Sequence, residues 1–217
     1  MAKKRSDSED SVEKIERAAL QLFAKKGYSN TSLEQVADMA GFTKGAVYYY
    51  FKTKETLLLH LLAQIQGRSI QATARRIHEM SDDAVQKLEA FVQLQAQWAA
   101  TYPDDLVILV LTSLEFHDAD TPVREAIRDY YRIMEELLTE VFTTGKGMGQ
   151  INPGVDITSA VLANIARHDG NMLLWHRSGC DPSVGRMLTS AARHAVRQFG
   201  VVPNEGAESR ASKSSSS

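Results

Sequence analysis

The chain has very little of the chemistry that cross-links a protein or anchors it in a membrane. Its 217 residues include one cysteine and five prolines, so an internal disulfide framework and a cysteine-based zinc site are excluded. The longest strongly apolar run, Leu106 to Leu111, is too short to span a bilayer. The start, from Met1 to Asp10, is polar and lacks the apolar core of a signal peptide. We therefore expect a soluble, cytoplasmic protein with no membrane partner.

Signatures of catalysis and of cofactor binding are also missing. The sequence has no HExxH zinc motif, nucleophile elbow, phosphate-binding loop or dinucleotide-binding glycine pattern. We expect no catalytic residue, no metal and no cofactor. One alternative is an all-helical, metal-dependent hydrolase that uses Glu115, His117, His168 and Asp169, although the last two are adjacent and diverge by about 100° on a helix. A second alternative is a helical adaptor that binds protein.

Positive and negative charges nearly balance, with 25 Lys and Arg against 27 Asp and Glu. Residues 1–60 have a balance of +2, whereas the remainder has a balance of −4. A slightly basic N-terminal segment on an acidic body weakly favours an anionic partner at that end. Ordinary surface charge explains the same asymmetry equally well.

Helical periodicity is present almost throughout the chain. Apolar residues recur at spacings of three and four, which predicts an all-α fold. The 106–114 run fits a buried strand or a buried helix, and its helical neighbours favour a helix. Residues 1–10 are expected to form a disordered basic and polar arm, and residues 203–217 a disordered Ser-rich tail. The predicted helices cover about 11–26, 33–40, 43–51, 53–80, 83–101, 106–114, 122–142, 155–177 and 182–199, with a glycine-rich loop over 145–153.

The most informative segment is 33–54, LEQVADMAGFTKGAVYYYFKTK. It reads as a helix, a turn containing Gly41 and a second helix, with Ala37 small enough for a close crossing. This is the pattern of a helix-turn-helix, whose second helix enters the major groove of DNA. Thr43 and Lys44 lie at the start of that helix, where free N–H groups favour an anion. Helix-turn-helix geometry also occurs in proteins that never bind DNA.

The same segment, extended over about residues 11–60, resembles the DNA-binding domain of the TetR (tetracycline-repressor-like) family. The family pattern is met at Gly45, Tyr48, Tyr49, Phe51, Lys54, Glu55 and Leu57. The resemblance implies an N-terminal three-helix DNA-binding domain over residues 11–55 and a larger helical effector-binding and dimerisation domain over 56–202. It also implies a homodimeric repressor that binds a palindromic operator in double-stranded DNA. It assigns DNA contact to Ser32, Thr43, Lys44, Gly45, Ala46, Tyr48, Tyr49, Tyr50 and Lys54.

Beyond residue 60 the sequence offers composition rather than motifs. The helices expected over 155–177 and 182–199 have small and apolar residues that suit a two-fold, four-helix dimer interface. Polar groups on otherwise apolar faces mark a small-molecule pocket, although each of them alone is explained by a core or surface role. The predicted effector is hydrophobic, and family branches that respond to fatty acids or acyl-CoA thioesters have a similar layout. The predicted pocket residues are Phe91, Gln95, Trp98, Leu114, Glu115, Asn164, His168, Asn171, Met172 and Trp175.

Overall fold

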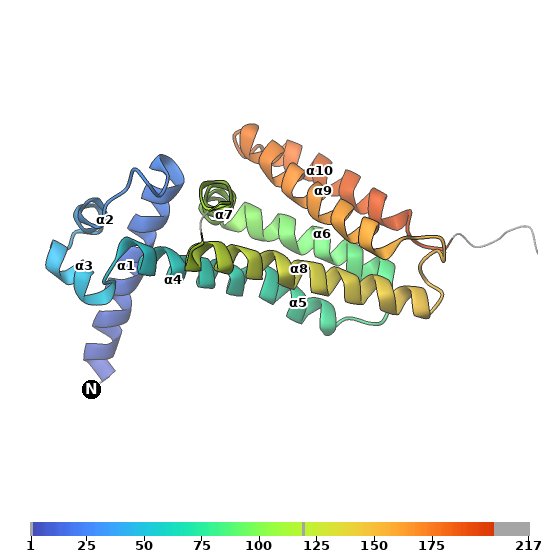
Figure 1. Ribbon diagram of the computed structural model, residues 1–217, viewed down its shortest axis with the longest axis horizontal. Helices are drawn as coiled ribbons and strands as arrows, with labels where there is room; N and C mark the ends of the chain where they lie inside the picture. The colour runs from blue at the N-terminus through green and yellow to red at the C-terminus, as the bar shows by residue number, and fades with distance from the viewer. Residues whose placement is uncertain (1, 119, 202–217) are drawn as a thin grey trace, which may run out of the picture.

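The computed structural model describes residues 2–118 and 120–201, and within these ranges it is helical, with no strand. Figure 1 shows a small head of α1–α3 at one end, a bundle of α5–α10 at the other, and α4 running from one into the other. The predicted all-α fold is confirmed. In the described part of the chain, no helix is both long and apolar enough to cross a membrane. The helices are α1 (Ala2–Lys26), α2 (Leu33–Ala40), α3 (Lys44–Tyr50), α4 (Lys54–Arg68), α5 (Ile70–His78), α6 (Ala84–Thr101), α7 (Pro103–Glu115), α8 (Pro122–Gly147), α9 (Ile157–Arg177) and α10 (Pro182–Arg197).

Local capping sets the boundaries of the head helices. Ser32 Oγ accepts a bond from the Gln35 N–H at 3.2 Å, and the Gln35 side chain accepts one from the Ser32 N–H at 3.0 Å. This reciprocal pair is a capping box, which satisfies two free donors at the start of α2. Gly41 ends α2 with a φ of 75°, a left-handed conformation that favours glycine. The turn that follows leads directly to Thr43, whose hydroxyl caps α3 by accepting from the Ala46 N–H.

The N-terminal segment differs from the prediction. We expected residues 1–10 to be disordered, but α1 begins at Ala2 and continues without a break to Lys26. The segment lacks proline and glycine within α1, so nothing in its backbone interrupts a helix that is already fixed by the apolar residues from Val12 onward. The tail predicted over 203–217 lies outside the described residues.

The long helix predicted from Thr53 to about Met80 is divided in two. Ser69, with φ −100° and ψ −98°, separates α4 from α5. Gly67 and Ser69 are poor helix formers, and small-residue pairs of this kind are frequent sites of kinks. Ser69 is also buried, and its hydroxyl is hydrogen-bonded to Tyr130 of α8 at 2.8 Å. Tertiary contacts therefore fix a break that the sequence periodicity does not reveal.

Part of the glycine-rich stretch that was predicted to be a loop, 145–153, is helical. α8 continues through Gly145 to Gly147 before it ends. A Cβ atom at Gly145 would overlap the Ala84 side chain and lie 2.9 Å from Ile151. The glycine is therefore needed where α8 passes the start of α6, and the helix continues because that packing leaves its backbone hydrogen bonds intact.

A buried ion pair joins α4 to the body. The Arg68 guanidinium donates to both oxygens of the Asp105 carboxylate, at 2.5 and 2.6 Å, and Asp105 is almost fully buried at the start of α7. α4 also contacts the head along its length, because Lys54 at its start bonds to the Tyr28 carbonyl, and Glu16 of α1 lies 2.6 Å from His60 and 2.8 Å from Gln64. α4 is thus anchored at both ends and mechanically links the head to the bundle.

Candidate nucleic-acid interface and ligand pocket

The second helix of the helix-turn-helix, α3, packs against the head core on one side and is exposed to solvent on the other. Val47 is fully buried against the head core, whereas Tyr49 is 74% exposed and its ring packs edge-on against Tyr50 at 5.2 Å. Thr43, Lys44 and Gly45 are exposed at the start of the helix. A Cβ atom at Gly45 would meet nothing within 4 Å, so the backbone is open for close approach to a surface. The exposed face of α3 therefore suits insertion into a groove of DNA.

The charge of Lys44 is already paired in the free protein. Its ammonium group bonds to the Glu34 carboxylate, and it lies 5.4 Å from the centre of the Tyr48 ring. This contact lowers the pKa of Glu34 to about 2 and raises the pKa of Lys44. At neutral pH both groups are ionised, so a DNA phosphate must compete with Glu34 for the lysine.

The two lysines beside the start of α4 have different environments. Lys52 is exposed, with its ammonium 5.9 Å from the centre of the Tyr49 ring. Lys54 donates to the Tyr28 carbonyl at 2.7 Å and lies 4.1 Å from the centre of the Tyr28 ring. Desolvation lowers the pKa of Lys54, with the charge of Glu115 acting in the opposite direction. Lys52 is therefore available to a phosphate, whereas Lys54 fixes the loop between α1 and α2.

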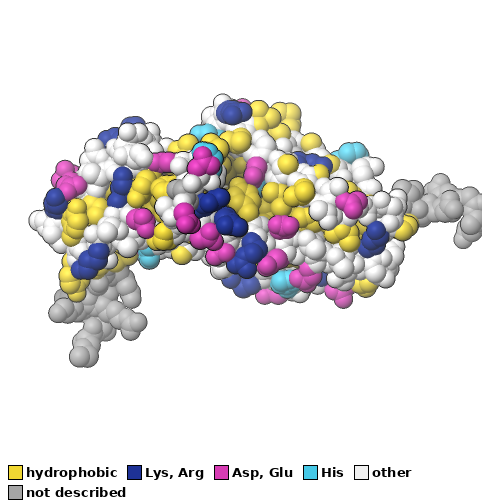
Figure 2. Space-filling model, in the orientation of Figure 1, with side chains coloured by type: hydrophobic (Ala, Val, Ile, Leu, Met, Phe, Trp, Pro, Cys, Tyr) yellow, Lys and Arg dark blue, Asp and Glu magenta, His cyan; other side chains and the backbone are white. Residues whose placement is uncertain are grey.

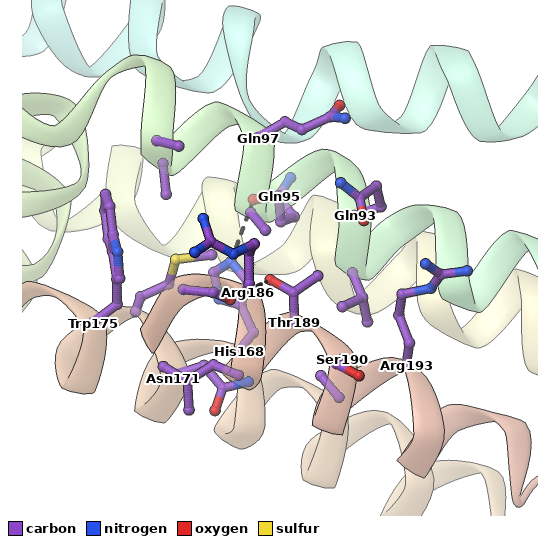
Figure 3. Close-up of a pocket in the computed structure, with 18 of the residues that line it drawn as sticks. Gln93, Gln95, Gln97, His168, Asn171, Trp175, Arg186, Thr189, Ser190 and Arg193 are labelled. Carbon is purple, nitrogen blue, oxygen red and sulfur yellow. Dashed lines mark hydrogen bonds between the residues drawn. The ribbon is translucent and has the colours of Figure 1, made fainter. Parts of the chain in front are cut away.

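A cavity of about 610 Å³ lies in the body, between α6, α9 and α10. Figure 3 shows glutamines reaching toward it from α6, and the labelled His168, Trp175, Thr189 and Arg193 approaching from α9 and α10. Apolar side chains from all three helices form much of its wall, including Phe91, Met172 and Leu188. A mostly apolar cavity of this size with a few polar groups is typical of a small-molecule site.

Gln95 connects this cavity to the interior of the bundle. Its side-chain oxygen lies 3.3 Å from His168 Nε2 and accepts a bond from Ser69 Oγ at 3.3 Å. Its amide nitrogen donates to Thr73 Oγ1 at 2.9 Å. Gln95 therefore contacts α9 in the cavity wall, the break between α4 and α5, and α5 itself.

Comparison with known proteins finds similarity to bacterial transcriptional regulators. A family model described as bacterial regulatory proteins, tetR family, matches residues 15–61. The fatty acid metabolism regulator protein of Bacillus subtilis (strain 168) is 26% identical over 158 residues, which are 73% of this chain and 79% of that protein. The transcriptional regulator LmrA from the same organism is 28% identical over 183 residues, covering 81% and 96%. The crystal structure of the MbdR regulator from Azoarcus sp. CIB superposes with a TM-score of 0.77 at 28% identity, covering 88% of this chain and 100% of that one.

The chain belongs to the TetR family of transcriptional regulators.

As expected for a TetR-family regulator, the chain is a DNA-binding protein, and the head contains its DNA-binding unit. Ser32 lies at the start of α2, and the predicted contacts from Thr43 to Tyr50 lie on or at the start of α3. Ala46 and Tyr48 are half-buried, so they are less open to DNA than Tyr49. Lys54 differs from the other predicted contacts, because its ammonium group is bonded to the Tyr28 carbonyl.

Most of the predicted pocket residues of this TetR-family chain do line the cavity. Three do not, and for these three the predicted place in the cavity wall is wrong. Trp98 is buried outside the lining. Leu114 is 67% exposed at the end of α7, and Glu115 bonds to Ser29 of the head. The end of α7 points toward the head rather than the cavity, a direction that periodicity does not encode. The residues that do line it are Phe91, Gln95, Asn164, His168, Asn171, Met172 and Trp175.

α10 contributes to the cavity as well as to the predicted dimer face. Arg186, Arg193 and Arg197 line the cavity and are not among the predicted pocket residues. Their spacings of seven and four residues place the three arginines on one side of a helix, and this periodic signal was available. For the alternative hydrolase, no group of three or more His, Cys, Asp or Glu in the described residues could hold a metal ion.

Proposed function

We propose that the protein is a repressor that binds a palindromic operator as a homodimer in the cytoplasm and is released by a hydrophobic small molecule. The exposed face of α3 supports this proposal most directly, because α3 lies within residues 15–61, the segment that matches the tetR family model. Two such helices held by a two-fold axis would match two half-sites about one DNA turn, or a multiple of it, apart.

The dimer proposal is supported by an apolar stripe that the single chain leaves uncovered. Leu162, Ala166, Gly170 and Leu174 follow one another at intervals of four on α9 and are all exposed, Leu162 at 56%. Met187 of α10 is 63% exposed. Figure 2 shows hydrophobic side chains on the upper part of the body, where Figure 1 draws α9 and α10. Two copies of this pair of helices would form a four-helix interface.

The effector proposal is supported by the cavity. Its apolar walls suit a hydrophobic molecule, and the relative named fatty acid metabolism regulator protein is consistent with a lipid-like compound. An effector acts only through its difference in affinity between two arrangements of the protein. We propose that the arrangement with the effector bound has its two heads out of register with the operator.

The proposed route of this change runs through hydrogen bonds. A molecule that displaces His168 or Gln95 alters the contact between Gln95 and Ser69. Ser69 ends α4, and His60 and Gln64 within α4 are bonded to Glu16 of α1 in the head. A small movement at Ser69 is therefore transmitted to α1 by one rigid helix.

The proposal is tested by selecting duplexes that the purified protein retains from random DNA. We expect a palindromic consensus, a complex of two chains per duplex, and release of the duplex by hydrophobic compounds. Retention of asymmetric sites by single chains would contradict the dimer. A high-affinity palindrome that no hydrophobic compound releases would contradict the effector. Failure to retain any duplex at low ionic strength, where phosphate contacts are strongest, would contradict the whole proposal.

A further inference from the structure

The cavity has an unusual distribution of charge for a chain whose formal net charge is −2. Four arginines line it, and no aspartate or glutamate does so in the part of the chain that the structure describes. The arginines come from two helices, α9 and α10. Their common sign creates a positive field along the wall of a partly apolar cavity. The four are Arg167, Arg186, Arg193 and Arg197.

The two ends of the cavity differ in charge, because Arg186, next to Gly185, is the one lining arginine near Trp175, and the other three lie farther along the helices. At one end the Trp175 indole N–H donates to the Asp181 carbonyl at 3.1 Å, beside Gly185 at the start of α10. Pro103 and Pro182 add further apolar surface to the lining. Arg197 lies twelve residues along α10 from Gly185, which corresponds to roughly 18 Å at 1.5 Å per helical residue. The cavity is thus elongated along α10, with Trp175 near one end and Arg197 near the other.

The arginine end has more positive charge than its single acid neutralises. Glu89 of α6 accepts from Arg193 at 2.6 and 2.9 Å and from Arg197 at 2.5 and 2.9 Å. These bonds lower the pKa of Glu89, so it is a carboxylate at neutral pH. One carboxylate between two guanidinium groups leaves one positive charge. It also holds both groups in a fixed orientation, as a preorganised anion site requires.

Arg167 adds a second uncompensated charge to the lining. Its guanidinium donates to Asn164 Oδ1 at 2.9 Å, and that partner is neutral. Asn164 lies eleven residues before Trp175 on α9, roughly 16 Å away along the helix axis. Since the Trp175 end of α9 meets the start of α10, Asn164 and Arg167 lie toward the other end of the cavity. Arg167, Arg193 and Arg197 therefore form one positive group, which we call the arginine end.

We propose that the cavity binds an amphipathic anion, with its acidic group at the arginine end and its apolar body directed toward Trp175. This inference rests on the proposed effector role of the cavity and specifies the chemistry and orientation of the effector. Carboxylate, sulfonate and phosphate groups all accept the forked hydrogen bonds of guanidinium. A neutral molecule of the same shape fills the apolar part but leaves the arginine end without an anionic partner.

The test compares two fluorescent probes that differ only in charge. 1-Anilinonaphthalene-8-sulfonate has an acidic group, whereas N-phenyl-1-naphthylamine has the same aromatic body without it. We expect the sulfonate to bind at least roughly tenfold more tightly, and its advantage to shrink as salt is added. Equal affinities, or an advantage that salt does not change, would overturn the proposal.

Matched variants locate the acidic group. Arg167→Gln keeps a donor for Asn164 but removes the charge, so the sulfonate should bind several-fold more weakly and the neutral probe should bind unchanged. Arg193→Gln should have the same selective effect, which provides a second test if either variant is poorly folded. Arg128→Gln is the control, because Arg128 lies on α8 outside the lining and is paired with Glu125. An equal effect of Arg128→Gln, or an equal loss of both probes in the cavity variants, would contradict the assigned position.

Competition and DNA release separate this inference from the proposed function. Dodecanoate or dodecyl phosphate should displace the sulfonate probe and release the operator more effectively than 1-dodecanol, and the more potent of the two anions identifies the preferred acidic group. If 1-dodecanol displaces the probe and releases the operator as effectively as the anions do, the effector is hydrophobic and the anion inference is wrong. If the anions displace the probe better than 1-dodecanol but no compound releases DNA, the anion inference stands and the proposed effector role fails.

Discussion

Ser69 Oγ donates to Gln95 Oε1 across 3.3 Å, and this contact joins the break between α4 and α5 to the wall of the cavity. Both side chains are almost fully buried, so neither has water as a substitute partner. Ser69 also lies 2.8 Å from the Tyr130 hydroxyl. The Ser69 hydroxyl therefore bonds the break between α4 and α5 to α6 and α8, and the position of the break depends on these bonds.

Replacing Ser69 by alanine should lower the free energy of unfolding by about 1–3 kcal/mol, because Gln95 and the buried Tyr130 hydroxyl each lose a partner. Amide exchange should also accelerate at the junction of α4 and α5. Urea unfolding and hydrogen–deuterium exchange measure the two effects. Thr112→Ala is the matched control, since Thr112 is also buried but bonds only within α7. Normal exchange at the junction in Ser69→Ala would show that the hydroxyl does not hold the break.

Removing the Asp105 carboxylate should be among the most damaging single changes to the body. Asp105→Ala leaves the Arg68 guanidinium largely buried without its anion, and loss of one partner of a buried pair costs about 3–5 kcal/mol. Asp129→Ala removes an exposed partner of Arg132 and should cost under about 1 kcal/mol. Urea unfolding of the two variants measures the contrast. Equal losses would mean that burial does not determine the strength of the Arg68 pair.

Lys52 and Lys54 should behave differently in DNA binding. Lys52→Gln should weaken binding to all sequences and reduce the slope of log affinity against log salt by about one unit, because one phosphate contact is lost. Lys54→Gln should leave that slope unchanged and lower the melting temperature instead, since the Tyr28 carbonyl loses its donor. Fluorescence anisotropy over a series of salt concentrations measures the slopes. A reduced slope for Lys54→Gln would restore the phosphate role expected from the sequence.

The features that the sequence predicted well are those encoded within a few residues. The turn at Gly41 and the helix start at Thr43 both depend on partners within four residues. The helices themselves could be predicted because apolar residues, which are buried, recur with helical spacing. The family pattern located the DNA-binding unit because that pattern is itself short and local.

The features that were missed depend on contacts between distant segments. Arg193 and Arg197 belong to the cavity because Glu89, more than 100 residues earlier, lies opposite them. Ser69 interrupts a continuous helical pattern because Gln95 and Tyr130 reach it from other helices. Lys54 is bonded to a carbonyl 26 residues earlier in the chain. No window of local sequence contains these partners.

Glu34 is expected to oppose DNA binding, because it pairs with Lys44 and places a negative charge near the phosphates. Glu34→Gln should strengthen binding to operator and to unrelated DNA alike and steepen the salt dependence by about one unit. Glu136→Gln, on an exposed face of α8, is the control for a change in net charge. Anisotropy titrations with both kinds of DNA measure the effect. Weaker binding by Glu34→Gln would mean that the carboxylate positions Lys44 rather than competing for it.

The uncovered stripe on α9 gives a direct test of the dimer. A Cβ atom at Gly170 meets nothing within 4 Å in the single chain, so Gly170→Arg should leave the monomer folded. In a four-helix interface, the same side chain would separate the two copies, giving monomers in sedimentation velocity and much weaker operator binding. Gly67→Arg is the matched control, because Gly67 is also helical with open space around its Cβ position but lies on α4. If Gly170→Arg sediments as the same species as Gly67→Arg and binds the operator equally well, the two copies meet elsewhere.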